Sequence, residues 1–91
     1  MIIRSQDKKN IVNFNNIKNI KVQGWENIFD ICVAEYNFFE KIGTYSTEEK
    51  AMKVLDDICA FANGIHFEKI ATDQCGRLDG VVFQMPQDSE V

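Results

Sequence analysis

Long apolar runs are missing from this 91-residue sequence. The longest near-apolar stretches, residues 31–34 and 81–83, are far shorter than the ~20 residues that a membrane-spanning helix needs. The first residues turn polar at Arg4 and lack the basic start and apolar core of a secretory signal. We therefore expect a protein of the cytoplasm with no membrane segment.

Cysteine, histidine and proline are also scarce. The three cysteines, Cys32, Cys59 and Cys75, are an odd number at wide spacings, whereas small disulfide-stapled domains carry a dense, even set. The single histidine, His66, precedes Asp73 and Cys75 by seven and nine residues, which is unlike the close ligand pairs of a zinc site. We expect reduced thiols, no metal and no cofactor.

The catalytic patterns are missing as well. The carboxylate pairs at 48–49 and 56–57 are adjacent on a predicted helix, so they point about 100° apart and do not converge as acid–base pairs must. No nucleophile elbow and no glycine-rich phosphate loop is present. These absences predict a protein that is not an enzyme.

The net charge of −4 is unevenly distributed. Residues 1–23 carry five cations and one acid, while residues 47–91 carry four cations and nine acids. Three interpretations are open: nucleic-acid contact, solvated charges that deter strand-edge pairing, or attraction between the basic end of one copy and the acidic end of another. No aromatic cluster alternates with the lysines, as a base-stacking platform would require. The candidate nucleic-acid contacts are Arg4, Lys8, Lys9, Lys18 and Lys21.

Alternating apolar residues predict strands through most of the chain. Two short strands flank a turn at residues 5–10, and a third spans residues 18–23 before a loop at 24–27. Residues 28–35 and 38–45 form the strongest pair, with Gly43 as a bulge or a point of close packing. A last strand covers residues 81–85.

At Ser46 the period changes to that of a helix, which we place at about residues 47–63. Ser46 and Glu49 are spaced as a capping box, and Asn63 and Gly64 form a stop signal. One apolar stripe follows from the spacing of Ala51, Leu55, Ile58, Cys59 and Ala62.

These elements indicate an α+β fold in a single domain, residues 1–91, with residues 87–91 as a frayed tail. We expect a mainly antiparallel sheet of five to six strands, with the amphipathic helix packed on one face.

Several short motifs resemble a group of short uncharacterised proteins of Gram-positive gut bacteria, their phages and mobile elements. The motifs are IRSQDK at 3–8, GTYSTEE at 43–49, VLDDI at 54–58 and FQMP at 83–86. Residues 60–80 fall outside the resemblance. It implies a bacterial, cytosolic setting and no activity, so it transfers no catalytic residue.

The central strand pair is apolar on both sides, and one helix can cover only one of them. A chain this short buries only about 60–65% of its unfolded surface, and an uncovered apolar face usually marks an interface. We therefore predict a homodimer formed through the sheet. Trp25, beside Gly24, either anchors a partner or caps the open end of the core. The residues predicted to form the self-association surface are Ile28, Tyr36, Phe38 and Phe39.

Overall fold

The computed structural model describes residues 1–35, 38–72 and 82–91, and the side chains of all of these except residues 65–72. Six strands and one long helix make up the described part, which confirms the α+β class. The strands form two sheets of three, so the prediction of a single sheet of five to six strands is wrong. The elements are β1 (Ile2–Arg4), β2 (Ile11–Asn13), β3 (Asn19–Trp25), β4 (Ile28–Glu35), β5 (Phe38–Tyr45), α1 (Glu48–Thr72) and β6 (Val82–Gln84), with short 3-10 turns at Phe14–Asn16 and Asp88–Glu90.

The larger sheet is antiparallel, in the order β3-β4-β5. Its strands β4 and β5 have the bounds that the sequence predicts, whereas β3 runs on to Trp25 and leaves only a two-residue turn before β4. A bulge lies where Ile31 pairs with Gly43 but Cys32 pairs with Lys41. A Cβ on Gly43 would lie 2.9 Å from the Met85 methyl carbon and 3.1 Å from the Tyr45 ring, so the glycine allows both side chains to pack closely against β5.

The smaller sheet has the order β2-β1-β6, and its two pairings differ in direction. Strands β1 and β2 form an antiparallel pair, while β1 and β6 run parallel. Parallel neighbours need a long crossover, and here the chain builds the whole of β2 to α1 before β6 returns to β1. That return separates β1 and β6 from the antiparallel meander and makes a second sheet.

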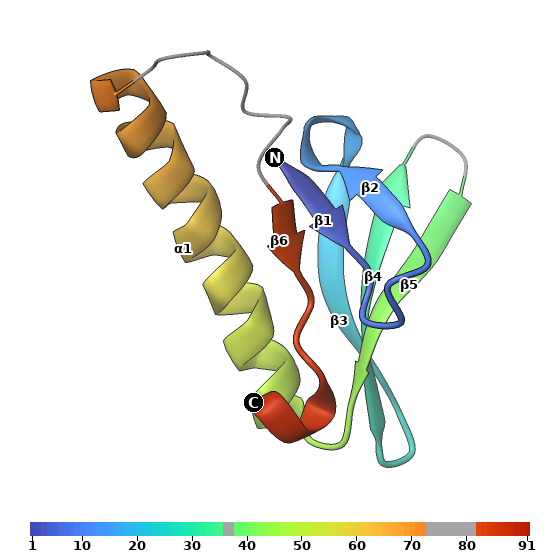
Figure 1. The fold of residues 1–91 in the computed structure, drawn as a ribbon. Coiled ribbons are helices and arrows are strands. Elements are labelled where there is room, and N and C mark those ends of the chain that lie inside the picture. The colour runs from blue at the N-terminus through green and yellow to red at the C-terminus, as the bar shows by residue number, and fades with distance from the viewer. Residues whose placement is uncertain (36–37, 73–81) are drawn as a thin grey trace.

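Helix α1 and the smaller sheet lie together on one face of the β3-β4-β5 sheet (Figure 1). All of these elements contribute to one core, whose fully buried members include Ile3 of β1, Ile31 of β4 and Ile58 of α1. The opposite face of the larger sheet has no covering layer among the described residues.

Helix α1 differs from its prediction at both ends. The Oγ1 atom of Thr47 accepts a hydrogen bond from the Lys50 amide (3.1 Å), so Thr47 caps the helix and the predicted capping box of Ser46 and Glu49 is wrong. The helix also continues through Gly64 to Thr72. A glycine inside a helix costs only about 1 kcal/mol, and residues 65–72 contain neither proline nor a second glycine to end it.

The buried stripe of α1 is also shifted from the predicted one. It consists of Ala51, Val54 and Ile58, all at 0–1% exposure, whereas Leu55 is half-buried and Cys59 is exposed. Burial therefore follows the i, i+3, i+7 positions of the same amphipathic pattern.

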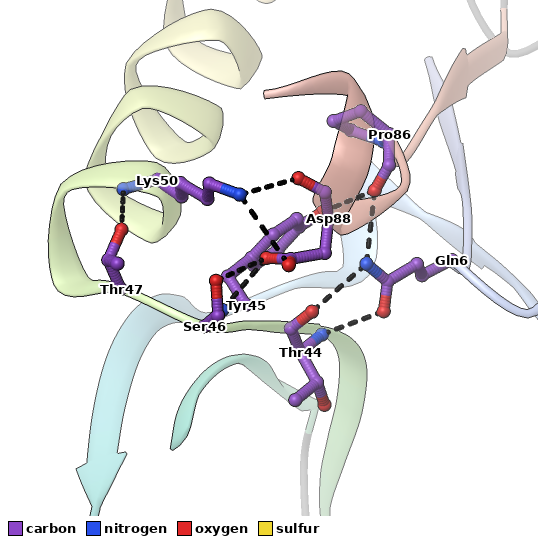
Figure 2. A network of polar contacts seen from close by, with 8 residues as sticks. All are labelled: Gln6, Thr44, Tyr45, Ser46, Thr47, Lys50, Pro86 and Asp88. Carbon is purple, nitrogen blue, oxygen red and sulfur yellow. Dashed lines mark hydrogen bonds and ion pairs between the residues drawn. The ribbon is translucent and has the colours of Figure 1, made fainter. Parts of the chain in front are cut away.

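The chain end, predicted to be frayed, is bound to the start of α1 (Figure 2). The carboxylate of Asp88 accepts hydrogen bonds from the Ser46 amide (2.8 Å) and hydroxyl (3.1 Å). Lys50 donates to the Asp88 carbonyl (2.9 Å) and lies 3.5 Å from its carboxylate. These contacts, led by the Ser46 amide, lower the pKa of Asp88, and they place a negative charge at the positive end of the helix.

Gln6 closes part of the free edge of β5 (Figure 2). Its side-chain amide accepts a hydrogen bond from the Thr44 amide (2.9 Å) and donates to the carbonyls of Thr44 (3.0 Å) and Pro86 (3.1 Å). Its backbone amide donates to the Ile42 carbonyl (2.8 Å). An unpaired edge attracts other strands, so these bonds make half of β5 unavailable for strand addition.

Candidate interaction surface on the larger sheet

Successive residues of a strand point to opposite faces of its sheet, so the pairing register assigns each side chain of β3, β4 and β5 to one face. One set points toward α1 and the smaller sheet and is mostly buried. We call the other side, turned away from α1 in Figure 1, the outer face. Its members are all exposed or half-buried: Asn19, Lys21, Gln23, Trp25, Ile28, Asp30, Cys32, Ala34, Phe39, Lys41 and Thr44.

Apolar side chains lie at both ends of the outer face. At one end Trp25 pairs with Ile28, and at the other Ala34 pairs with Phe39. Trp25, Phe39 and Ile28 are 73%, 66% and 48% exposed. Trp25 therefore does not cap the core, which leaves the anchoring role as the interpretation of this residue.

Two polar rows separate these apolar ends. The cationic row consists of Lys21, Cys32 and Lys41, which pair side by side across the three strands. The Asp30 row consists of Gln23, Asp30 and Thr44, and the Thr44 hydroxyl donates to the Asp30 carboxylate (2.9 Å). The middle of the outer face is therefore positive on one side and negative on the other.

Contacts within the cationic row tie it to the aromatic end. The Lys21 ammonium nitrogen lies 4.8 Å from the centroid of the Phe39 ring, within cation–π distance. Burial, and secondly the charge of Asp30, raise the pKa of the Cys32 thiol, while Lys21 and Lys41 act in the opposite direction. A thiol with a raised pKa is mostly protonated and a poor nucleophile at neutral pH, so Cys32 lies in the face as a small, weakly polar side chain.

The predicted self-association residues are only partly brought together. Ile28 and Phe39 lie on the outer face, at opposite ends of it. Phe38 pairs with Glu35, whose register places both on the other side of the sheet, although Phe38 is 53% exposed. Tyr36 lies outside the described residues. The sequence interpretation missed Trp25 as a member of this face because it placed that residue in a loop.

The five cations proposed to contact nucleic acid divide between two places. Arg4 ends β1, and its side chain donates to the carbonyl of Lys8 (3.3 Å) in the turn that joins β1 to β2. Lys9 lies in the same turn. Lys18 directly precedes β3, and Lys21 lies within it. This division does not favour one nucleic-acid surface.

A shallow pocket of about 160 Å³ lies between the β1–β2 turn and the β5 bulge, lined by residues 5–7 and 41–44. The Asp7 carboxylate in it accepts hydrogen bonds from the Ser5 hydroxyl and the Lys9 amide, which lower the pKa of Asp7. Asp7 therefore holds the turn in shape and is not poised to take up a proton. Among the side chains that the structure describes, no three ligand-type residues gather to hold a metal ion. The side chains of His66, Asp73 and Cys75 lie outside that set.

No helix in the described ranges has the length and apolar character to cross a membrane. Comparison with known proteins finds no matching family model, no matching curated protein and no matching solved structure. The fold and the surface together describe a small α+β protein in which the described residues leave one sheet face uncovered. The functional argument therefore rests on that face.

Proposed function

We propose that this protein is a non-enzymatic interaction module of the cytoplasm that self-associates through the outer face. The supporting observation is that Trp25, Ile28 and Phe39 stand exposed on one side of one sheet. Tryptophan is among the residues that contribute most to interfaces, and large apolar side chains exposed at both ends of one face favour an association surface. The resemblance to short bacterial and phage proteins supports a bacterial cytosolic setting.

The size of the outer face sets the expected strength of association. Three strands of about seven residues span roughly 14 by 23 Å. Two such faces, about 320 Å² each in projection, are smaller than the ~1,200 Å² of a standard specific interface, so we expect a weak, transient association with a dissociation constant on the order of tens of micromolar. The dimer is therefore expected to exchange with monomer over an accessible concentration range.

Sedimentation velocity over roughly 1 to 100 micromolar brackets that affinity and tests the proposal. We expect the mass to rise with concentration from 10.5 kDa toward twice that value. Replacing both Trp25→Ala and Phe39→Ala removes the apolar ends of the face and should leave a monomer throughout. The matched control is Ile11→Ala, because Ile11 is 64% exposed but belongs to β2 of the smaller sheet.

A chain that stays at 10.5 kDa at every concentration contradicts the proposal. Equal weakening of the dimer by Ile11→Ala and by the double replacement on the outer face also contradicts the proposal, because the contact would then include β2.

A further inference from the structure

The four rows of the outer face follow a self-complementary order along the strands. From the end of β4 to its beginning, the rows are the apolar Ala34–Phe39 end, the cationic row, the Asp30 row and the apolar Trp25–Ile28 end. Read in the opposite direction, the apolar ends exchange places and the positive and negative rows exchange places. A second copy turned end for end therefore offers each row a complementary one.

Homodimers are mostly closed two-fold assemblies. A two-fold axis that lies between the stacked faces can run either parallel or perpendicular to the strands. If the axis runs parallel to the strands, each row meets itself, so Lys21 and Lys41 meet the same cations and Asp30 meets Asp30. If the axis runs perpendicular to the strands and crosses between the two polar rows, the cationic row meets the Asp30 row. Charge complementarity fixes the register of an interface, and like charges across it oppose association.

We propose that two copies of this chain stack their outer faces about a two-fold axis perpendicular to the strands, so that Asp30 of each copy faces the cationic row of the other. The inference rests on the proposed self-association and specifies its geometry. In this arrangement each strand lies over the same strand of the other copy, so Ile28 of one copy lies over Ala34 of the other. Lys21, already over the Phe39 ring, is held where the partner carboxylate arrives.

Charge reversal on the outer face tests this geometry, first in single variants and then in a mixture of two chains. In the perpendicular arrangement Asp30→Lys makes both polar rows positive, and the pair Lys21→Glu with Lys41→Glu makes both negative. Each should weaken dimerisation at least tenfold. Combining all three replacements restores opposite rows, and the dissociation constant should return to within a few-fold of the original. In the parallel arrangement the partial reversals also bring like charges together, so a mixture of the natural chain with the triple variant decides between the two stackings. In a mixed dimer the perpendicular arrangement places rows of like charge over each other, so each chain should pair with its own kind. The parallel arrangement places rows of opposite charge over each other, so mixed dimers should be preferred.

Matched controls separate row complementarity from net charge. Asp56→Lys, on the exposed side of α1, makes the same charge change as Asp30→Lys. Lys8→Glu with Lys9→Glu, in the exposed β1–β2 turn, matches the double reversal of the cationic row. Neither control should weaken the dimer by more than about twofold, because exposed charges farther apart than the ~8 Å Debye length are screened at physiological salt. Circular dichroism of every variant establishes that each is folded.

The outcomes distinguish the geometry from the proposed function. A natural chain that is monomeric overturns both. A natural chain that dimerises while the reversals on the outer face have no effect, or no more effect than their controls, overturns the perpendicular stacking alone. Failure of the triple reversal to restore the dimer also overturns it. A preference for mixed dimers of the natural chain with the triple variant also overturns it. The proposed geometry requires weakening by each partial reversal, recovery in the triple variant, and no preference for mixed dimers.

Discussion

The two faces of the β3-β4-β5 sheet are built from alternate residues of the same strands, and they differ sharply. Ile31 and Val33 on the inner face are 0% exposed, whereas Trp25 and Phe39 on the outer face are 73% and 66% exposed. Backbone pairing is common to both faces, so only the side chains and their covering layers differ. The inner face contributes to the buried core, whereas the outer face carries apolar side chains that the core does not bury.

The inner side is also closed by polar contacts from distant parts of the chain. The Tyr45 hydroxyl donates to the Pro86 carbonyl (2.8 Å), and Gln6 reaches the same carbonyl from the β1–β2 turn. Within the described residues, no buried side-chain nitrogen or oxygen lacks a hydrogen-bond partner. An unsatisfied buried polar group is costly, so these hydrogen bonds allow the inner side to be buried as a core. Mutations on the two faces can therefore be compared directly.

The largest difference between the faces should appear when an inner isoleucine is truncated. Ile31→Ala leaves a cavity at a fully buried position and should lower the free energy of unfolding by about 3 kcal/mol. Ile28→Ala, the same change on the outer face of the same strand, should cost under about 1 kcal/mol. Urea denaturation at a concentration below the dimer range measures both. Equal losses would contradict the distinction between the faces.

Removing one hydroxyl from the inner side should have the next largest effect. Tyr45→Phe removes one of the two hydrogen bonds to the Pro86 carbonyl. Gln6 still donates to that carbonyl, so it is not left unsatisfied, and we expect the free energy of unfolding to fall by about 1 kcal/mol. Thermal or urea unfolding at neutral pH measures this loss.

The same variant should change the alkaline limit of stability. Burial raises the pKa of Tyr45, so the folded chain keeps the phenol proton at a pH where the unfolded chain releases it. This contribution is complete below the ordinary pKa of 10.0 and is lost as the pH rises above it. The natural chain should therefore lose more stability above pH 10 than Tyr45→Phe does. Identical alkaline profiles would contradict the burial of this hydroxyl.

A smaller, acid-side effect should come from the chain end that closes the inner side. The pKa of Asp88 is lowered in the folded chain, so its contribution is present above the ordinary value of 3.8 and is lost as the pH falls below it. Asp88→Asn should flatten the fall in stability on acidification relative to the natural chain. Asp56→Asn, on the exposed side of α1, is the matched control for the loss of one negative charge.

The smallest effect on folding should come from the most exposed large side chain. Trp25→Ala should change the free energy of unfolding of the monomer by no more than about 0.5 kcal/mol, because Trp25 is 73% exposed. The same variant should weaken dimerisation severely. A large loss of monomer stability would show that Trp25 serves the fold.

Local patterns predicted the central part of this fold well. The bounds of β4 and β5 follow from uninterrupted alternation between turn residues, and the role of Gly43 follows from its place beside a bulge. The division into two sheets does not follow, because the parallel pairing of β1 with β6 joins residues about eighty positions apart. The contact of Asp88 with the start of α1 was missed for the same reason: its partner Ser46 is 42 residues away.

The candidate surface was predictable only in part. Ile28 and Phe39 follow from the expectation that the strand pair is apolar on both sides. Strand alternation places the adjacent Phe38 and Phe39 on opposite faces, but only the register, which the bulge between them and Gly43 shifts, decides which of the two lies on the outer face. The order of the charged rows also depends on that register, so it could not be seen in the sequence.

The fluorescence of Trp25 tests the central claim most directly, because Trp25 is the single tryptophan of the chain and lies on the outer face. We predict that raising the protein concentration through the micromolar range shifts its emission to shorter wavelength and protects it from an aqueous quencher. The transition should coincide with the rise in sedimenting mass, since both report burial of the same face. An emission that stays solvent-exposed while the mass doubles would contradict the account, because the copies would then meet through another surface.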